Sequence, residues 1–148
     1  MKKLYVVGNK VSKSLSPTIF NYWFKKYNIK ASYGYLELTE KNFHKKIKEV
    51  LEKKDTLGLN VTIPFKNKII KHLGKIDAHA KKIGAVNCVT NKKTINGTNT
   101  DWTGYYKTLP NIKKTKNRKV IILGYGGASH AIHSVSYTHL TLPTNREV

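Results

Sequence analysis

The sequence is poor in cysteine, arginine, acidic residues and long apolar runs, and each shortage excludes a class of protein. Cys88 is the only cysteine among 148 residues, which excludes an internal disulfide and a cysteine-based zinc cluster. No apolar stretch approaches the roughly 20 residues of a membrane-spanning helix. The apolar run at residues 4–8 is too short for a signal peptide. These absences favour a cytoplasmic protein.

The scarcity of acidic side chains leaves a formal net charge of +20, with 28 basic residues against 8 acidic ones. Arg118 and Arg146 are the only arginines, so almost all of the positive charge comes from lysine. Proteins that read bases or phosphates normally use the planar fork of arginine. The lysines also scatter over predicted helices and loops. We therefore favour compositional drift over nucleic-acid binding, although a positive field could still attract anionic substrates and cofactors.

The apolar pattern alternates between strand-like and helix-like segments along most of the chain. At this length the chain can hold one domain with a real core, or one small domain plus part of another. Alternating strands and helices predict an α/β fold, an open and mostly parallel sheet covered by helices on both faces. We expect strands at residues 3–7, 31–38, 57–62, 85–90 and 94–97, and helices near residues 17–27, 40–53, 64–73, 77–83 and 99–109.

Two hydroxyl side chains precede the first predicted helix. Ser16 is a good N-cap and Pro17 a good first helical residue. Ser14 and Ser16 would then lie beside free N–H groups at the positive end of a helix, which is a suitable place for a carboxylate or phosphate. The alternative is that Ser16 only caps its helix. In the same way Thr39 is expected to cap the second helix, and Gly84 to end the fourth.

The segment 60–66, with sequence Asn-Val-Thr-Ile-Pro-Phe-Lys, is predicted to form a strand-to-helix corner. Pro64 stops the strand, because proline has no N–H for the ladder, and suits the first turn of a helix. Asn60, Thr62 and Lys66 are thereby placed where open α/β sheets bind their ligands. The alternative is an ordinary strand end with a solvated lysine.

A second region begins after the charged connector 113–119. Residues 120–123 are predicted to be a buried strand, and the segment 124–129 that follows it is rich in glycine and leads into a helix. This order is typical of a dinucleotide-binding loop, whose glycines let the backbone approach a pyrophosphate. Gly-x-Gly-Gly matches the usual motif only in part. The ribose-reading acid or phosphate-reading arginine expected about 20 residues later has almost no room before Val148.

The segment 134–148 loses the lysine bias, contains Pro143 and shows no clear helical period. We expect it to be a non-native or artefactual tail on a truncated chain, so that the second half of a nucleotide-binding domain is absent. A genuine irregular tail is the alternative.

Five short motifs together resemble the shikimate dehydrogenase family over residues 4–133. They occur in the family's order and near its spacing, and they are Ser14-Leu-Ser-Pro17, the segment 60–66, Gly84-Ala-Val-Asn87, Asn99-Thr-Asp101 and the segment 124–129. The resemblance implies NADPH-dependent reduction of 3-dehydroshikimate to shikimate, in the chorismate pathway to aromatic amino acids. It also implies a substrate domain at residues 1–112 and the start of an NADP-binding, Rossmann-like domain at residues 113–133.

The resemblance also assigns roles to individual residues. Lys66 and Asp101 would be the catalytic pair, because a positioned ammonium can stabilise and protonate the oxygen of a ketone as it is reduced. Ser14 and Ser16 would bind the substrate carboxylate, while Thr62, Asn87 and Asp101 would bind ring hydroxyls and the reacting oxygen. The cofactor loop would be formed by Gly124, Tyr125, Gly126, Gly127 and Ala128. No metal site is expected, since the histidines lack ligand spacing.

Some features depart from the family pattern. Tyr125 is bulky where the family usually has alanine, and the later residues that select NADP and close the site are missing. We therefore expect little or no activity from these 148 residues. The remaining alternatives are a basic nucleic-acid-binding module and a non-catalytic shikimate- or quinate-binding domain. The choice between NADP and NAD and a homodimer of the full-length protein both stay open.

Overall fold

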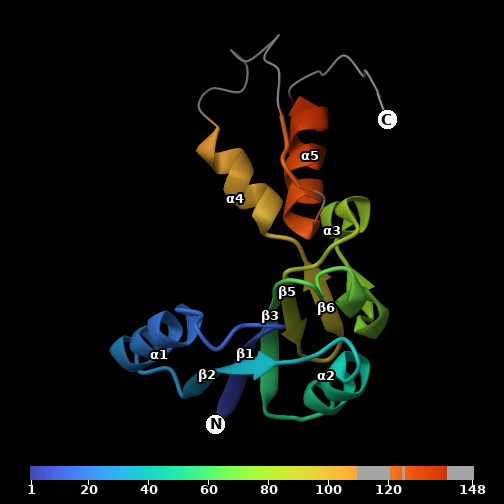
Figure 1. Ribbon diagram of the computed structural model, residues 1–148. Coiled ribbons are helices and arrows are strands. Elements are labelled where there is room, and N and C mark those ends of the chain that lie inside the picture. The colour runs from blue at the N-terminus through green and yellow to red at the C-terminus, as the bar shows by residue number, and fades with distance from the viewer. Residues whose placement is uncertain (110–120, 125, 140–148) are drawn as a thin grey trace.

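The protein is described by a computed structural model that covers residues 1–109, 121–124 and 126–139. Its centre is a six-stranded open sheet with strand order β2-β1-β3-β5-β6-β4 (Figure 1). β1 is parallel to β2 and β3, and β4 is parallel to β6, whereas β5 is antiparallel to both of its neighbours. The strands are β1 (Lys2–Gly8), β2 (Ala31–Glu37), β3 (Thr56–Val61), β4 (Lys75–Ile76), β5 (Cys88–Asn91) and β6 (Ile95–Thr98). The predicted α/β class with an open, mostly parallel sheet is confirmed, and the antiparallel β5 makes the sheet mixed.

Helices cover both faces of this sheet, because successive side chains of a strand point to opposite faces. Val6 of β1 packs with Val11 and Tyr33 on the face covered by α1 (Ser16–Lys26). Val7, the next residue, belongs to the larger core on the other face. That core includes apolar side chains of α2 (Phe43–Leu51), η1 (Lys68–His72) and α3 (Ala78–Ile83).

Two predicted helix caps are wrong. Ser16 is the first residue of α1 and Leu15 occupies the N-cap position, where no side chain caps the helix. The second helix begins at Phe43, after the turn in which Asn42 Oδ1 accepts a hydrogen bond of 2.9 Å from the N–H of Thr39. In both places a short polar segment satisfies its own backbone groups before the helix begins, which sequence preference alone does not reveal.

The helix predicted to begin at Pro64 is also wrong. The Ile63–Pro64 bond is cis, and the N–H of Phe65 donates to the carbonyl of Thr62 at 2.9 Å, which closes a turn. Within the predicted range 64–73, all of which the structure describes, the only helical segment is the short 3₁₀ helix η1. By contrast, α3 agrees with its prediction: Asp77 Oδ1 accepts from the N–H of Ala80 at 2.8 Å, and Gly84 ends the helix with a φ of 71°.

α4 (Asp101–Thr108) and α5 (Gly127–His139) stand beyond the end of the sheet near α3 (Figure 1). A small core of Ile83, Ala85 and Ala131, with Trp102 packed against it, joins these helices to the sheet-bearing part. The segment from residue 134 was expected to lack helical structure, but α5 continues through His139. It does so because Val135, one turn beyond Ala131, is buried with it.

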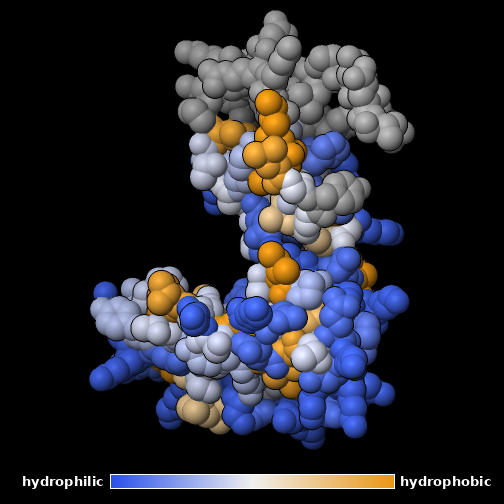
Figure 2. All heavy atoms as spheres, in the orientation of Figure 1, coloured by the Kyte–Doolittle hydropathy of each residue, from blue (hydrophilic) through white to orange (hydrophobic). Residues whose placement is uncertain are grey.

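The predicted buried strand at residues 120–123 is not observed at residues 121–123. Ile121 and Leu123 are 85% and 94% exposed. Figure 2 shows hydrophobic atoms gathered in the part of the molecule that holds α4 and α5, above a mostly hydrophilic sheet-bearing part. Within the described ranges no second strand lies beside this segment, so a sheet cannot form there. Val120, the connector 113–119, Tyr125 and residues 140–148 lie outside the described residues.

Candidate functional site

An open cavity of about 600 Å³ lies where the loop after β1, the end of β3 and the start of α4 meet. In Figure 2 the molecule is hollowed on the side between α1 and α4. The structure brings together all six residues that the sequence placed at the substrate and catalytic positions. The cavity is lined by Ser14, Ser16, Thr62, Lys66, Asn87 and Asp101.

The two residues predicted as a catalytic pair are in direct contact. Lys66 Nζ donates a hydrogen bond of 2.7 Å to Asp101 Oδ2, and the two side chains are 15% and 31% exposed. Lys66 follows the turn after β3, whereas Asp101 is the first residue of α4. Gly127 allows α5 to come close to this pair, because a Cβ there would lie 3.2 Å from side-chain atoms of Lys66.

Asn87 holds the second oxygen of the carboxylate. Its Nδ2 donates to Asp101 Oδ1 at 2.7 Å and to Thr100 Oγ1 at 2.9 Å, while its Oδ1 accepts from the N–H of Thr100 at 2.8 Å. Both oxygens of Asp101 are therefore engaged, one by an ammonium and one by an amide. This arrangement fixes the orientation of the carboxylate and, through it, the position of Lys66 Nζ.

Asn99 binds the first N–H groups of α4, whose N-cap position is occupied by Thr100. Its side chain is 2% exposed, and Oδ1 accepts from the N–H groups of Asp101 at 3.0 Å and Trp102 at 3.4 Å. Its Nδ2 donates to the carbonyl of Ala85 at 3.0 Å. An aspartate at the start of a helix often serves as an N-cap that accepts from these N–H groups. Because Asn99 supplies that contact, the carboxylate of Asp101 stays available to Lys66.

The serine loop is held in place by an acidic residue of β2. Glu37 Oε2 accepts hydrogen bonds from the N–H groups of Val11 at 2.9 Å and Ser12 at 3.0 Å. The hydrogen bond from Ser12 has the larger effect and the one from Val11 the next, and both lower the pKa of the Glu37 carboxyl group. Further along, Ser14 Oγ lies 3.2 Å from both the N–H and the Oγ of Ser16. The two serine hydroxyls thus share one end of the cavity.

Sequence reasoning did not assign Lys10, Lys13 or Tyr33 to the site, and it placed Asn60 at the strand-to-helix corner without a binding role. Asn60, Lys10 and Lys13 line the cavity directly. Tyr33 reaches it indirectly, since its Oη donates to Asn60 Oδ1 at 2.6 Å. Asn60 had a visible signal, its place at the end of a predicted strand. Tyr33 had none, because a tyrosine in an apolar strand is indistinguishable from an ordinary core residue.

A second cavity, of about 700 Å³, adjoins the first and shares Thr62 and Lys66 with it. Of the predicted cofactor loop, Gly124, Gly126, Gly127 and Ala128 line this cavity, and Tyr125 lies outside the described residues. α5 begins at Gly127, so the first N–H groups of a 13-residue helix face this region. The fit to a pyrophosphate rests on these donors and on the glycine backbone.

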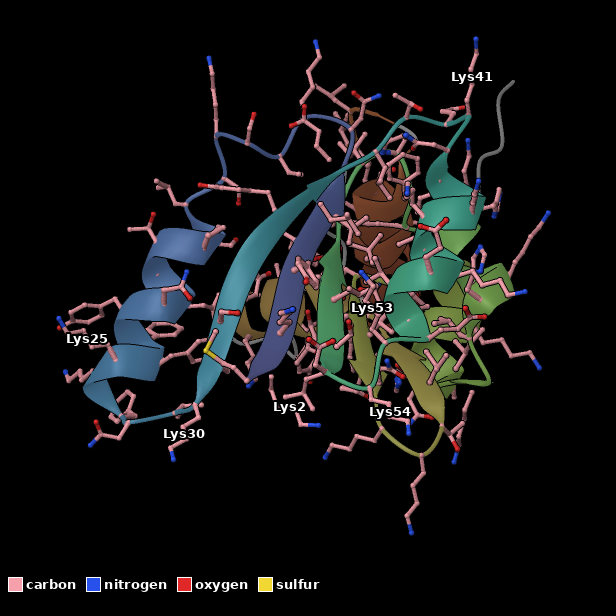
Figure 3. All side chains as sticks on the ribbon, turned by 90° about the horizontal axis from the view of Figure 1, so that it is seen from below. Lys2, Lys25, Lys30, Lys41, Lys53 and Lys54 are labelled. Carbon is pink, nitrogen blue, oxygen red and sulfur yellow. The ribbon has the colours of Figure 1, made fainter. Side chains whose placement is uncertain are left out.

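Other kinds of site have less support in the described residues. Within residues 1–109, 121–124 and 126–139, no group of three or more histidine, cysteine or acidic side chains is placed to hold a metal ion. The helices in the described part of the chain are too short or too polar to span a bilayer. Figure 3 labels lysines from several elements, with Lys25 and Lys41 far apart in the view and Lys2, Lys30 and Lys54 along one edge. Their spread over several elements agrees with the scattered lysines of the sequence.

The fold and the cavity together define a substrate-binding domain of α/β type, with a charged pair at the edge of a small polar hollow. Residues 6–89 match the family model described as the shikimate dehydrogenase substrate binding domain. The chain therefore belongs to the shikimate dehydrogenase family.

Individual relatives agree with this assignment. The chain is 42% identical over 133 residues to shikimate dehydrogenase (NADP(+)) of Staphylococcus haemolyticus (strain JCSC1435), covering 88% of this chain and 49% of that one. The structure is similar to shikimate dehydrogenase from Aquifex aeolicus, with a TM-score of 0.85, 34% identity and coverage of 95% and 53% of the two chains. It is also similar to the Thermus thermophilus enzyme in complex with NADP(H) and shikimate, with a TM-score of 0.79, 28% identity and coverage of 95% and 54%. The chain spans about half the length of the relatives it matches.

Proposed function

We propose that the cavity beside Lys66 binds shikimate and 3-dehydroshikimate, and that the parent protein is an NADP-dependent shikimate dehydrogenase of aromatic amino acid biosynthesis. The observation that carries the proposal is the Lys66–Asp101 contact of 2.7 Å at the edge of a cavity that also holds Ser14, Ser16 and Asn87. A cyclic polyol acid offers the matching groups, which are one carboxylate, several hydroxyls and one carbonyl oxygen.

Each end of the cavity has a distinct chemical role in this proposal. Ser14 and Ser16 donate hydrogen bonds to the substrate carboxylate, and Lys10 and Lys13 supply positive charge near them. Thr62, Asn87 and Asp101 bind ring hydroxyls. Lys66 stabilises the negative charge that builds on the reacting oxygen and gives its Nζ proton to that oxygen.

The adjoining cavity is the proposed cofactor site. NADPH bound there would supply the hydride. Residues 124–128 would hold its pyrophosphate through backbone N–H groups and the start of α5. Because Thr62 and Lys66 line both cavities, substrate and cofactor would meet at Lys66.

We assign residues 1–112 to the substrate domain, residues 113–133 to the start of the NADP-binding domain, and residues 134–148 to a non-native tail. The chain by itself would then bind substrate but catalyse little or no turnover. NADPH-dependent reduction of 3-dehydroshikimate by these 148 residues, measured as loss of NADPH absorbance, would refute the second part of this proposal.

The binding proposal is tested by titrating shikimate into the ¹⁵N-labelled chain and following backbone amide shifts. We expect shifts at the Ser14 loop and at the start of α4, with clearly weaker binding in Ser14→Ala and Lys66→Met. Quinate in a parallel titration distinguishes the two polyol acids. Unchanged spectra at millimolar shikimate would contradict the proposal. Strong, salt-sensitive binding of an oligonucleotide together with unchanged spectra would favour the nucleic-acid alternative.

A further inference from the structure

Tyr33 is a buried tyrosine of β2 whose hydroxyl reaches toward the substrate cavity. The side chain is 4% exposed, and its ring stacks on Phe20 with centroids 4.6 Å apart and planes 6° apart. Its backbone N–H donates to Asn21 Oδ1 at 2.9 Å, and its carbonyl accepts from Asn21 Nδ2 at 2.8 Å. The ring and the main chain of Tyr33 are therefore fixed independently of any contact made by the hydroxyl.

That hydroxyl makes one short contact, a donated hydrogen bond of 2.6 Å to Asn60 Oδ1. Burial raises the pKa of Tyr33 to about 12, so the group is a neutral phenol and a donor at ordinary pH. Asn60 lies in β3, between Val6 of β1 and Cys88 of β5, so its backbone is held on both sides. The hydroxyl of Tyr33 and the backbone that carries the Asn60 amide are therefore both held in place.

The direction of this hydrogen bond decides what Asn60 offers to the cavity. An asparagine amide carries an acceptor oxygen and a donor nitrogen, which a rotation of its terminal bond exchanges. With Oδ1 occupied by Tyr33, Nδ2 is the group left for a ligand, and Asn60 lines the cavity beside Thr62 and Lys66. The rotated amide would instead present its oxygen to the cavity. That oxygen could accept a hydrogen bond from a ligand hydroxyl but could not donate one.

On the basis of the proposed function, we propose that Tyr33 is a positioning residue of the substrate cavity. Its hydroxyl locks Asn60 so that Nδ2 donates to an oxygen of the bound polyol acid. Tyr33 touches no ligand itself and acts through Asn60 alone. It thereby makes this part of the cavity selective for oxygen groups that accept a hydrogen bond.

The test compares shikimate affinity of the full chain in Tyr33→Phe, Asn60→Ala and the double variant, by titration followed with NMR. Tyr33→Phe removes one oxygen and keeps the ring on Phe20. We expect about fivefold weaker binding in Tyr33→Phe, the equivalent of roughly one hydrogen bond. In the Asn60→Ala background the same change should have no further effect, since Tyr33 acts only through Asn60. Equal losses in both backgrounds would overturn the proposal.

Asn60→Asp provides a second test, because a carboxylate keeps an acceptor for Tyr33 but has no donor for the ligand. We expect Asn60→Asp to lose shikimate affinity by more than Tyr33→Phe does while its thermal midpoint stays near that of the wild type. Tyr35→Phe is the matched control, since Tyr35 lies two residues along the same strand and is 47% exposed. It should bind shikimate like the wild type.

A ligand-free measurement separates this inference from the proposed function. The side-chain amide protons of Asn60 should shift and exchange faster in Tyr33→Phe, and should be unchanged in Tyr35→Phe. If the wild type does not bind shikimate but this amide response is seen, the proposed ligand is wrong and the positioning by Tyr33 stands. If the Asn60 amide signals do not respond to Tyr33→Phe, the positioning role is overturned whatever the ligand.

Discussion

Lys66 Nζ and Asp101 Oδ2 lie 2.7 Å apart although the two residues are 35 positions apart in the sequence. The contact joins the turn after β3 to the first residue of α4, and thus the sheet-bearing part to the helices beyond it. Asn87 completes it by holding the other oxygen of Asp101. Three segments that are distant in the sequence therefore determine one ammonium position.

Replacing Lys66 by methionine should impair binding much more than folding. The pair is partly exposed, so its loss should lower the free energy of unfolding by only about 1 kcal/mol. Shikimate affinity should fall at least tenfold, because a charge-assisted hydrogen bond to the ligand is lost. Urea denaturation and NMR titration measure the two effects. If the free energy of unfolding and the free energy of shikimate binding fell by equal amounts, this would count against a functional role for Lys66.

Glu37→Gln should loosen the serine loop while leaving the fold intact. Both backbone N–H groups donate to the same carboxylate oxygen, Oε2, and a glutamine oxygen in its place would be uncharged and would accept weaker hydrogen bonds. We expect weaker shikimate binding and faster hydrogen exchange at Val11 and Ser12. Unchanged exchange at these two amides would contradict the anchoring role of Glu37.

The same carboxyl group gives a pH dependence at acid pH. The folded pKa of Glu37 lies below its ordinary value of 4.5, so its stabilising effect is present above pH 4.5 and is lost as the pH falls through the folded pKa. The thermal midpoint of the wild type should therefore fall more steeply below pH 4.5 than that of Glu37→Gln. Parallel curves for the two proteins would show that the carboxylate does not carry this effect.

Two glycines should respond to alanine in opposite directions. A Cβ on Gly58 of β3 would lie 2.5 Å from the carbonyl oxygen of Val89 on β5. Because that oxygen belongs to the backbone of a paired strand, it cannot easily move away. Gly58→Ala should therefore cost about 2 kcal/mol or more, within the usual range for overpacking. Gly104 is inside α4 with open space around it, so Gly104→Ala should add about 0.5–1 kcal/mol. Thermal or urea unfolding of both variants gives the comparison, and a stable Gly58→Ala would contradict the close approach of the strands.

His44 and His72 form a ring-to-ring contact between α2 and η1, with His44 Nδ1 and His72 Nε2 separated by 2.8 Å. Burial first, and the charge of His44 second, lower the pKa of His72 below its ordinary value of 6.5. Between the folded pKa and 6.5 the unfolded chain binds more protons, so stability decreases as the pH is lowered through this window. His72→Gln should weaken that decrease. An NMR titration midpoint for His72 at or above 6.5 would contradict the prediction.

The sequence alone determined the fold class and six of the residues that line the cavity. Alternating apolar runs indicated a sheet with helices on both faces. The spacing of apolar residues differs between strands and helices, and it can be seen in short stretches of sequence. The motifs around Ser14, Lys66 and Asp101 indicated which polar groups would gather, and the structure places all six predicted substrate and catalytic residues around one cavity.

Tertiary structure decided what depends on partners distant in the sequence. Asn99 accepts from the first N–H groups of α4 and so leaves Asp101 to Lys66, and Tyr33 of β2 reaches Asn60 of β3 across the intervening β1. The apolar run at residues 121–123 forms no strand, because a β-strand exists only where another strand offers hydrogen-bonding groups to it. Such partners come from the folded arrangement of the whole chain, which local preference does not encode.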